Sequence, residues 1–232
     1  MKSRKPALRL FLGMLFLVPF FFIGDLVQHF YVYLSGNILT GVIISQWHIV
    51  AISTLIFVAL LIPLSFRKKA SWLERGLVSA FFVSLFVEMY GIPLTIILAS
   101  NYFFAPGAAI PGNLVEFSFL GVGFGMDFGM TYGAVLIITG ASLILAGWVT
   151  LYRNRGRGIV VQGIYSYSRH PQNLGLVLVV LGWFVAWPTI LTVVFAPILI
   201  YRYISLSRKE ESEMSRDYPG YSEYSEAVPF LI

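Results

Sequence analysis

Residues 174–204 read LGLVLVVLGWFVAWPTILTVVFAPILIYRYI. As one helix this apolar run would be too long for a bilayer, and it would carry Pro188 in its interior, where proline removes a backbone hydrogen bond. Trp187 adds to the signal, because tryptophan prefers the membrane interface. We therefore predict a helical hairpin that turns at Trp187-Pro188. Its arms, of about 14–16 residues each, are slightly short for a span, so local thinning of the bilayer and a partial hairpin both stay open.

The positively charged residues mark one side of the membrane. All 16 Lys and Arg residues lie in four clusters that apolar segments separate, namely 2–9, 67–75, 153–169 and 202–216. Cytoplasmic loops of membrane proteins carry an excess of Lys and Arg. The hairpin returns the fourth cluster, 202–216, to the side of the membrane on which the third cluster, 153–169, lies. The pattern predicts that the clusters, both termini and whatever chemistry the clusters carry face the cytoplasm of a cell membrane or an endomembrane.

The composition is that of an integral membrane protein. Of the 232 residues, 58% are hydrophobic and 12% are charged, whereas a soluble domain carries about 25% charged residues. Four segments besides the hairpin have the roughly 20 apolar residues that a membrane helix needs. They are 8–34, which we expect to end or bend near Asp25, and 45–66, 77–99 and 131–151.

The fold class that follows is an all-α membrane protein with about six transmembrane helices, including the short C-terminal hairpin. We expect one compact bundle, with N-terminal helices and an outer loop in residues 1–130 and a C-terminal half in residues 131–232. The cations flank membrane segments instead of forming one basic face, so no nucleic acid partner is expected. The chain has no cysteine, which excludes disulfides and cysteine nucleophiles.

Few ionisable residues fall inside the predicted helices. Glu88 sits near the middle of one, where a carboxylate is costly. Shaping a polar substrate pocket and bonding a neighbouring helix in protonated form are both open roles for it. Asp25 and His29 share a helix face and are expected near the outer interface, in contact with solvent. His48 is expected at an outer helix end, and three separated histidines predict no metal site.

The loop 101–128 is rich in Gly and Pro and is predicted to lie outside. A phosphate-binding loop would need a strand before the glycines and a helix after them, and neither is expected here. We interpret the glycines as positions where helices pack closely. They are Gly121, Gly123, Gly125, Gly129 and Gly133.

Two polar groups flank the hairpin. The first is GIYSYSRHPQNLG, residues 163–175, which offers aromatic faces, an imidazole and, at Pro171, a residue suited to the first turn of a helix. The second contains Glu210 and Glu211. The hairpin brings the groups together, although roughly 40 residues separate them. Such a pocket suits a polar cofactor from the cytosol. Anchoring of Tyr and Arg at the interface and a solvated acidic helix end are the alternative interpretations.

The order of these parts resembles a known superfamily. Gly-x-Tyr, Arg-His-Pro, a short hairpin, Glu-Glu and a tail with Tyr-x-x-Tyr before Val-Pro are similar to the isoprenylcysteine carboxyl methyltransferases and phospholipid methyltransferases. The tail here reads YPGYSEYSEAVP, residues 218–229, and the resemblance covers residues 131–232. It implies an integral membrane methyltransferase that uses S-adenosylmethionine. Its acceptor would be a lipophilic small molecule or a prenylated group that enters from the membrane lipids.

The resemblance also implies roles for single residues. The implied cofactor-binding residues are Arg157, Gly158, Ile159, Val160, Tyr165, His170, Pro171, Gln172, Asn173 and Glu211. Glu210, Arg202 and Arg208 are the candidates for catalysis. Aromatic rings suit adenine or a sulfonium cation, and a carboxylate suits a ribose or an ammonium group.

Two positions depart from the family pattern. Asn173 stands where the family's His-Pro-x-Tyr ends in tyrosine, so one aromatic contact is missing. Ser207 stands four residues before Glu211, where the prenylcysteine enzymes have an arginine that steers the substrate carboxylate. Arg202 or Arg208 would have to replace that arginine. The departure argues against a carboxylate acceptor and leaves a lipid amine, a phenol or another prenylated group open.

Two other functions compete with a methyltransferase. Membrane reductases of the sterol-reductase type, which use NADPH, resemble the chain through an Arg-His-Pro-Asn-Tyr stretch and a similar Val-Pro tail. Here Gln172-Asn173 replaces Asn-Tyr, and the acidic pair after the hairpin favours the methyltransferase. A non-catalytic membrane scaffold, with the motifs as interfacial anchors, is the third hypothesis.

Overall fold

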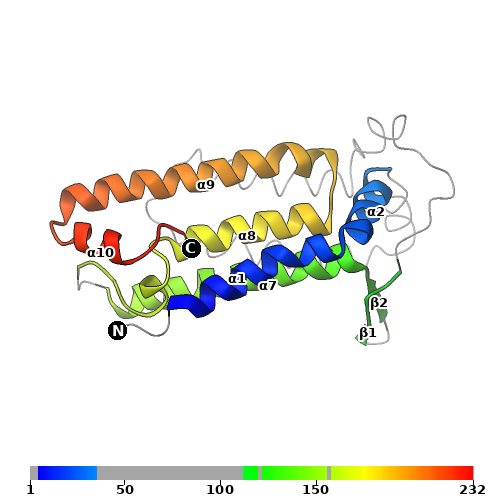
Figure 1. Ribbon diagram of the computed structural model, residues 1–232, viewed down its shortest axis with the longest axis horizontal. Helices are drawn as coiled ribbons and strands as arrows, with labels where there is room; N and C mark the ends of the chain where they lie inside the picture. The colour runs from blue at the N-terminus through cyan, green and yellow to red at the C-terminus, as the bar shows by residue number, and fades with distance from the viewer. Residues whose placement is uncertain (1–4, 36–111, 120–121, 156–157, 232) are drawn as a thin grey trace. The chain divides into compact units, whose positions relative to one another are not determined.

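The computed structural model describes residues 5–35, 112–119, 122–155 and 158–231. In these ranges the chain is mostly helical and has one two-stranded sheet (Figure 1). The elements are α1 (Lys5–Phe21), α2 (Ile23–Leu34), β1 (Val115–Phe119), β2 (Val122–Met126), α7 (Phe128–Arg153), the 3₁₀ helix η1 (Gly163–Ser166), α8 (Pro171–Ala186), α9 (Ile190–Asp217) and α10 (Tyr221–Ala227).

The chain divides into two compact units. The first comprises Met1–Ile23, Ala134–Gly182 and Ile200–Ile232. The second comprises Gly24–Gly133 and Trp183–Leu199. The polar groups on either side of the hairpin fall in the first unit, and the hairpin turn falls in the second.

Long apolar helices confirm the membrane character of the chain. α7 and α9 are each long and apolar enough to cross a membrane. α1 and α2 form a bent pair that counts as one more candidate span, so the described residues hold two or three. The pair breaks at Phe22, three residues before the expected bend at Asp25. The predicted helices 45–66 and 77–99, with His48 and Glu88, lie outside the described residues, so the total of six crossings stays a prediction.

The predicted hairpin is present. α8 ends at Ala186 and α9 begins at Ile190. Two buried threonines cap the start of α9, since the Thr189 N–H donates to Thr192 Oγ1 at 2.7 Å and the Thr192 N–H donates to Thr189 Oγ1 at 3.2 Å. The prediction of two short arms was wrong for the second one, because α9 continues for 28 residues. Beyond the apolar segment it contains several Arg and Glu residues together with Lys209 and Met214, and these residue types favour helix.

α7 and α8 pack closely in the first unit. Gly140 and Gly175 face each other, and a Cβ added to Gly175 would lie 2.5 Å from the carbonyl oxygen of Gly140. Contact between small residues lets two helix backbones approach, as is common between membrane helices. This contact holds the start of α8 against α7, next to the residues that precede the hairpin.

The described part of 101–128 contains a β-hairpin. β1 and β2 pair antiparallel, with Val115 opposite Met126. The expectation that no strand precedes a helix here was therefore wrong. The alternation of Val115-Glu116-Phe117-Ser118-Phe119 is typical of a half-buried strand. Between β2 and α7 lies Asp127 alone, so no glycine-rich loop joins strand to helix.

Close helix packing is confirmed at Gly129 of α7, where an added Cβ would collide with the His29 ring of α2. The prediction that His29 contacts solvent was wrong, because its exposed fraction is 0%. Its Nδ1 lies 2.6 Å from Asp127 Oδ2, and its Nε2 donates to the Val185 carbonyl at 2.8 Å. Asp127 also accepts the Met130 N–H at 2.8 Å, so it caps α7 while it holds His29. Asp25 is exposed, as predicted.

Candidate functional site

The chain makes a defined turn between α7 and α8. Gly163 adopts φ +61°, a left-handed conformation that glycine takes without strain, and its Cβ position lies 3.2 Å from Thr150 of α7. η1 follows, and the Ser168 Oγ then accepts the His170 N–H at 3.3 Å. α8 begins at Pro171, the first-turn position predicted for that proline. This geometry places Arg169 and His170 immediately before the first turn of α8.

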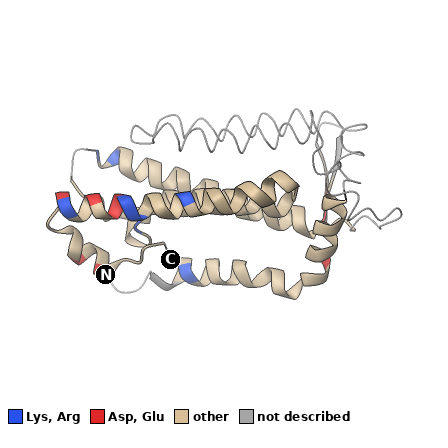
Figure 2. Cartoon of the chain, turned by 90° about the horizontal axis from the view of Figure 1, so that it is seen from above, with Lys and Arg blue, Asp and Glu red and all other residues tan. Residues whose placement is uncertain are grey.

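Acidic residues of α9 lie opposite this turn. From Ile190 to Tyr201 α9 carries no charged residue, whereas its last part is rich in both signs of charge. Figure 2 marks acidic and basic positions toward the C-terminal end of α9, and acidic positions on α10. Glu210 and Glu211 lie in this charged part and complete the cluster with Arg169, His170 and Asn173. We call these five residues the hairpin-base cluster.

Glu211 is the most heavily bonded carboxylate of the hairpin-base cluster. Its Oε1 lies 2.5 Å from an Arg169 Nη1 and accepts the Tyr221 hydroxyl of α10 at 3.3 Å. Burial is the main cause that raises the pKa of the Tyr221 hydroxyl above its ordinary value, and the Glu211 charge adds to it. Tyr221 therefore stays protonated and donates its hydrogen to Glu211. The two charged side chains remain 15% and 23% exposed, so a ligand from solvent can reach them.

His170 lies between the two carboxylates. Its Nδ1 is 3.4 Å from Glu210 Oε2 and its Nε2 is 3.4 Å from Glu211 Oε1. The edge of its ring meets Phe230, with the centroids 5.1 Å apart. The distance between His170 Nε2 and Glu211 Oε1 suits an ion pair, but the contact does not have the geometry of a hydrogen bond. In the described part of the chain, His170 Nε2 and Arg169 Nε are buried and have no hydrogen-bond partner. Buried donors of this kind are where a bound polar group fits.

The C-terminal tail closes over this turn. The Arg169 N–H donates to the Pro229 carbonyl at 3.0 Å, and the Tyr224 hydroxyl donates to the Tyr165 carbonyl at 2.7 Å. Figure 1 shows α10 and the end of the chain beside the loop that leads into α8. Phe230 covers the Arg169 guanidinium, which lies 5.7 Å from the ring centroid. The tail thus shields the cluster from water on one side.

Of the predicted site residues, His170, Asn173, Glu210 and Glu211 come together in the cluster. Pro171 is buried at the start of α8, and Gln172 packs on Gly147 of α7, 2.6 Å from its Cβ position.

The remaining predicted cofactor residues precede α8. Tyr165 lies in η1 and supplies the carbonyl that Tyr224 binds. Gly158, Ile159 and Val160 lie in the loop before η1, where Gly158 adopts φ +79°. Arg157 lies outside the described residues. For these positions a contact with a cofactor stays a prediction.

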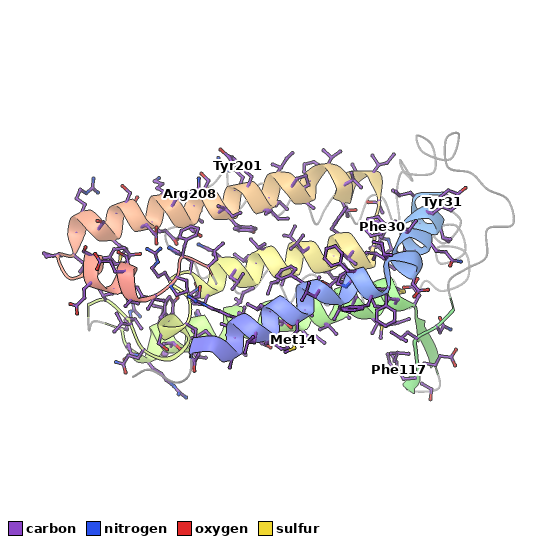
Figure 3. The ribbon with its side chains drawn as sticks, viewed as in Figure 1. Met14, Phe30, Tyr31, Phe117, Tyr201 and Arg208 are labelled. Atoms are coloured by element: carbon purple, nitrogen blue, oxygen red, sulfur yellow. The ribbon has the colours of Figure 1, made fainter. Side chains whose placement is uncertain are left out.

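The two candidate arginines lie on α9, where Arg202 is half-buried. In the part of the chain that the structure describes, neither forms an ion pair with Glu210 or Glu211. Arg208 is exposed, and Figure 3 shows it on α9 with the 69% exposed Tyr201. Three residues that the sequence did not assign to the site belong to it, namely Arg169, Tyr221 and Phe230. The signal for Arg169 was present, because it adjoins His170 inside the quoted motif.

Comparison with known proteins gives one match. Residues 128–220 match the family model described as phospholipid methyltransferase. No curated protein and no solved structure matches the chain. The matched residues run from the start of α7 to the turn before α10, and they include every residue of the hairpin-base cluster. Residues 128–220 are therefore a phospholipid methyltransferase domain, of the superfamily that includes the isoprenylcysteine carboxyl methyltransferases, in a chain with the apolar helices of a membrane protein.

Proposed function

We propose that the chain transfers the methyl group of S-adenosylmethionine to a lipophilic acceptor that enters from the bilayer. The observation that carries the proposal is the hairpin-base cluster, in which Arg169 and His170 meet Glu210 and Glu211 inside the matched domain. The positive-inside pattern of the sequence supports a cytoplasmic position for this site.

The side chains present suit the proposed cofactor. S-adenosylmethionine supplies an electrophilic methyl group on a sulfonium cation, together with an amino acid part and a ribose. The buried Arg169 Nε and His170 Nε2 are donors for a carboxylate. Glu211 offers an acceptor for an ammonium group or a ribose hydroxyl, and Tyr221 and Arg169 fix its orientation. The residues from Arg157 to Val160, with Tyr165, would complete the binding site from the loop side.

Glu210 is the proposed proton acceptor. Its side chain is one-third exposed (33%), more than that of Glu211 (23%). An ammonium or hydroxyl acceptor must lose a proton before its nitrogen or oxygen can attack the methyl group, and the Glu210 carboxylate would take that proton. The methyl–sulfur bond would break as the new bond forms, and S-adenosylhomocysteine would leave. Arg202 or Arg208 would bind an anionic part of the acceptor near the membrane surface. Methyl transfer depends mainly on placement and on exclusion of water, which the closing tail supports.

The test is a methyl-transfer assay with the full chain reconstituted in lipid vesicles. Tritium-labelled S-adenosylmethionine and a total membrane lipid extract are added, and label in the organic phase is counted. We expect label in lipid with wild type, and a strong loss with Glu210→Gln. NADPH serves as the comparison ligand in a thermal unfolding assay. Stabilisation by NADPH alone would favour the reductase, and stabilisation by neither ligand would favour a scaffold.

A further inference from the structure

Asn173 lies in the first turn of α8 and is buried to 2% exposure. Its side-chain amide faces α9, where Nδ2 donates to the Ser207 Oγ at 2.7 Å and to Glu210 Oε2 at 3.2 Å. Both contacts join α8 to α9 within the first unit. A buried asparagine that donates both amide hydrogens to one neighbouring helix has a defined orientation.

The direction of each hydrogen bond follows from Ser207. Its hydroxyl has one hydrogen, which it donates to the Tyr203 carbonyl at 3.0 Å. The Ser207 oxygen must therefore accept from Asn173, which fixes Nδ2 as the atom that faces α9. The second hydrogen of the same NH₂ group points to Glu210, whose Oε2 also lies 3.4 Å from His170 Nδ1. One carboxylate oxygen of Glu210 is thus held from two sides.

We infer that Asn173 is a positioning residue that acts through Glu210. Asn173 holds the Glu210 carboxylate where that carboxylate would take the proton of the methyl acceptor. The inference rests on the proposed function. An amide suits this task because it donates hydrogen bonds without a charge of its own. A misplacement of about 1 Å in a catalytic group can lower a rate by about two orders of magnitude.

A double-mutant cycle of Asn173→Asp and Glu210→Gln tests the inference. In Asn173→Asp the new side chain has the same shape as asparagine, but its carboxylate cannot donate a hydrogen bond. It would therefore face the Glu210 carboxylate. In the double variant of Asn173→Asp with Glu210→Gln, the hydrogen bond forms again in the reverse direction, because the glutamine amide donates to the aspartate carboxylate. The matched control is Asn154→Asp, which loses a donor to the Thr150 carbonyl (2.9 Å) at the end of α7, outside the cluster.

Two readouts separate positioning from a purely structural role. The first is the unfolding temperature of each detergent-solubilised variant without ligand. We expect Asn173→Asp to lower it and the double variant to recover it in part, because the donor to Ser207 is not restored. The second is methyl transfer from tritium-labelled S-adenosylmethionine into membrane lipid extract. Here we expect Asn173→Asp to lose about tenfold or more, Asn154→Asp to retain the rate, and the double variant to be as slow as Glu210→Gln alone.

Non-additive loss of rate in the double variant supports the inference. A full rate in Asn173→Asp, or losses that multiply in the double variant, overturns it and leaves the proposed function standing. A wild-type chain that transfers no methyl group overturns the proposed function, and the inference with it. The unfolding temperatures of the cycle still report whether Asn173 and Glu210 are coupled.

Discussion

At the scale of single residues, two ion pairs in the described part of the chain differ in their surroundings. The side chains of His29 and Asp127 are 0% and 6% exposed, and Asp127 also caps α7. The Arg169–Glu211 pair is more open, and it leaves buried donors of Arg169 and His170 without hydrogen-bond partners among the described residues. The first pair ties α2 to α7, whereas the second is partly exposed to solvent.

His29→Ala should destabilise the protein strongly. The substitution leaves the buried Asp127 without its imidazole partner, and loss of one partner of a buried pair costs about 3–5 kcal/mol. Thermal unfolding in detergent measures the effect. Asp25→Ala, at an exposed position of the same helix, is the control and should change stability by less than about 0.5 kcal/mol. Equal effects of the two substitutions would contradict the structural role of His29.

Stability should fall at high pH through Tyr221. Its pKa is raised in the folded state, mainly by burial, so the folded chain binds this proton more tightly than the unfolded chain. The resulting stabilisation is present below pH 10.0, the ordinary pKa of tyrosine, and is lost as the pH rises through the raised pKa. Unfolding temperatures measured across this alkaline range should fall less steeply for Tyr221→Phe. Identical pH profiles of wild type and Tyr221→Phe would contradict the contribution of the buried Tyr221 hydroxyl to stability.

How well single residues of the site could be predicted from the sequence depended on the chemistry of the residue type. The hairpin predicted that His170 would lie beside Glu210 and Glu211, and the structure confirms this, whereas the roles assigned to these residues came from the resemblance to the methyltransferase superfamily. Tyr221 and Phe230 were missed, since aromatic residues are common at membrane interfaces and their pattern does not tell a packed ring from an anchor. His29 was placed in solvent because its partner Asp127 lies 98 residues away, and no local pattern reports such a contact.

At the scale of elements, helix packing decides where the cluster forms. Gly140 and Gly175 let α7 and α8 approach, and the polar bonds of Asn173 join α8 to α9. The hairpin was predictable, because Trp187-Pro188 interrupts an apolar run. The length of α9 was not, since its last part is charged and its contacts with α8 join residues far apart in the sequence. The β-hairpin was overlooked because its glycines were assigned to helix packing.

Gly175→Ala should weaken the contact between α7 and α8. The added Cβ would lie 2.5 Å from a backbone oxygen, which cannot move without shifting the helix. Overpacking of this kind costs about 1–3 kcal/mol. Gly13→Ala is the matched control, because nothing lies within 4 Å of its Cβ position in α1. That control should gain about 0.5–1 kcal/mol, as alanine favours a helix over glycine. An unfolding temperature raised by both substitutions would refute the close contact.

At the scale of the whole molecule, one domain contains the proposed site. Residues 128–220 contain α7, α8 and α9 with the entire hairpin-base cluster, and α10 and the tail close over it. The membrane class and the family of this domain were predictable, since composition and the order of motifs are properties of the linear chain. The acceptor was not, because the motifs do not describe the part of the site that would bind it.

The most direct test of the account is the affinity of the full chain for S-adenosylmethionine, measured by calorimetry in detergent. Loss of a hydrogen bond to a charged group costs about 1.5–3 kcal/mol. The account predicts that wild type binds, that Glu211→Gln binds at least about tenfold more weakly, and that Glu223→Gln, at an exposed position of α10, binds like wild type. A wild type that does not bind S-adenosylmethionine, or equal affinity in wild type and Glu211→Gln, would contradict a cofactor site at the base of the hairpin.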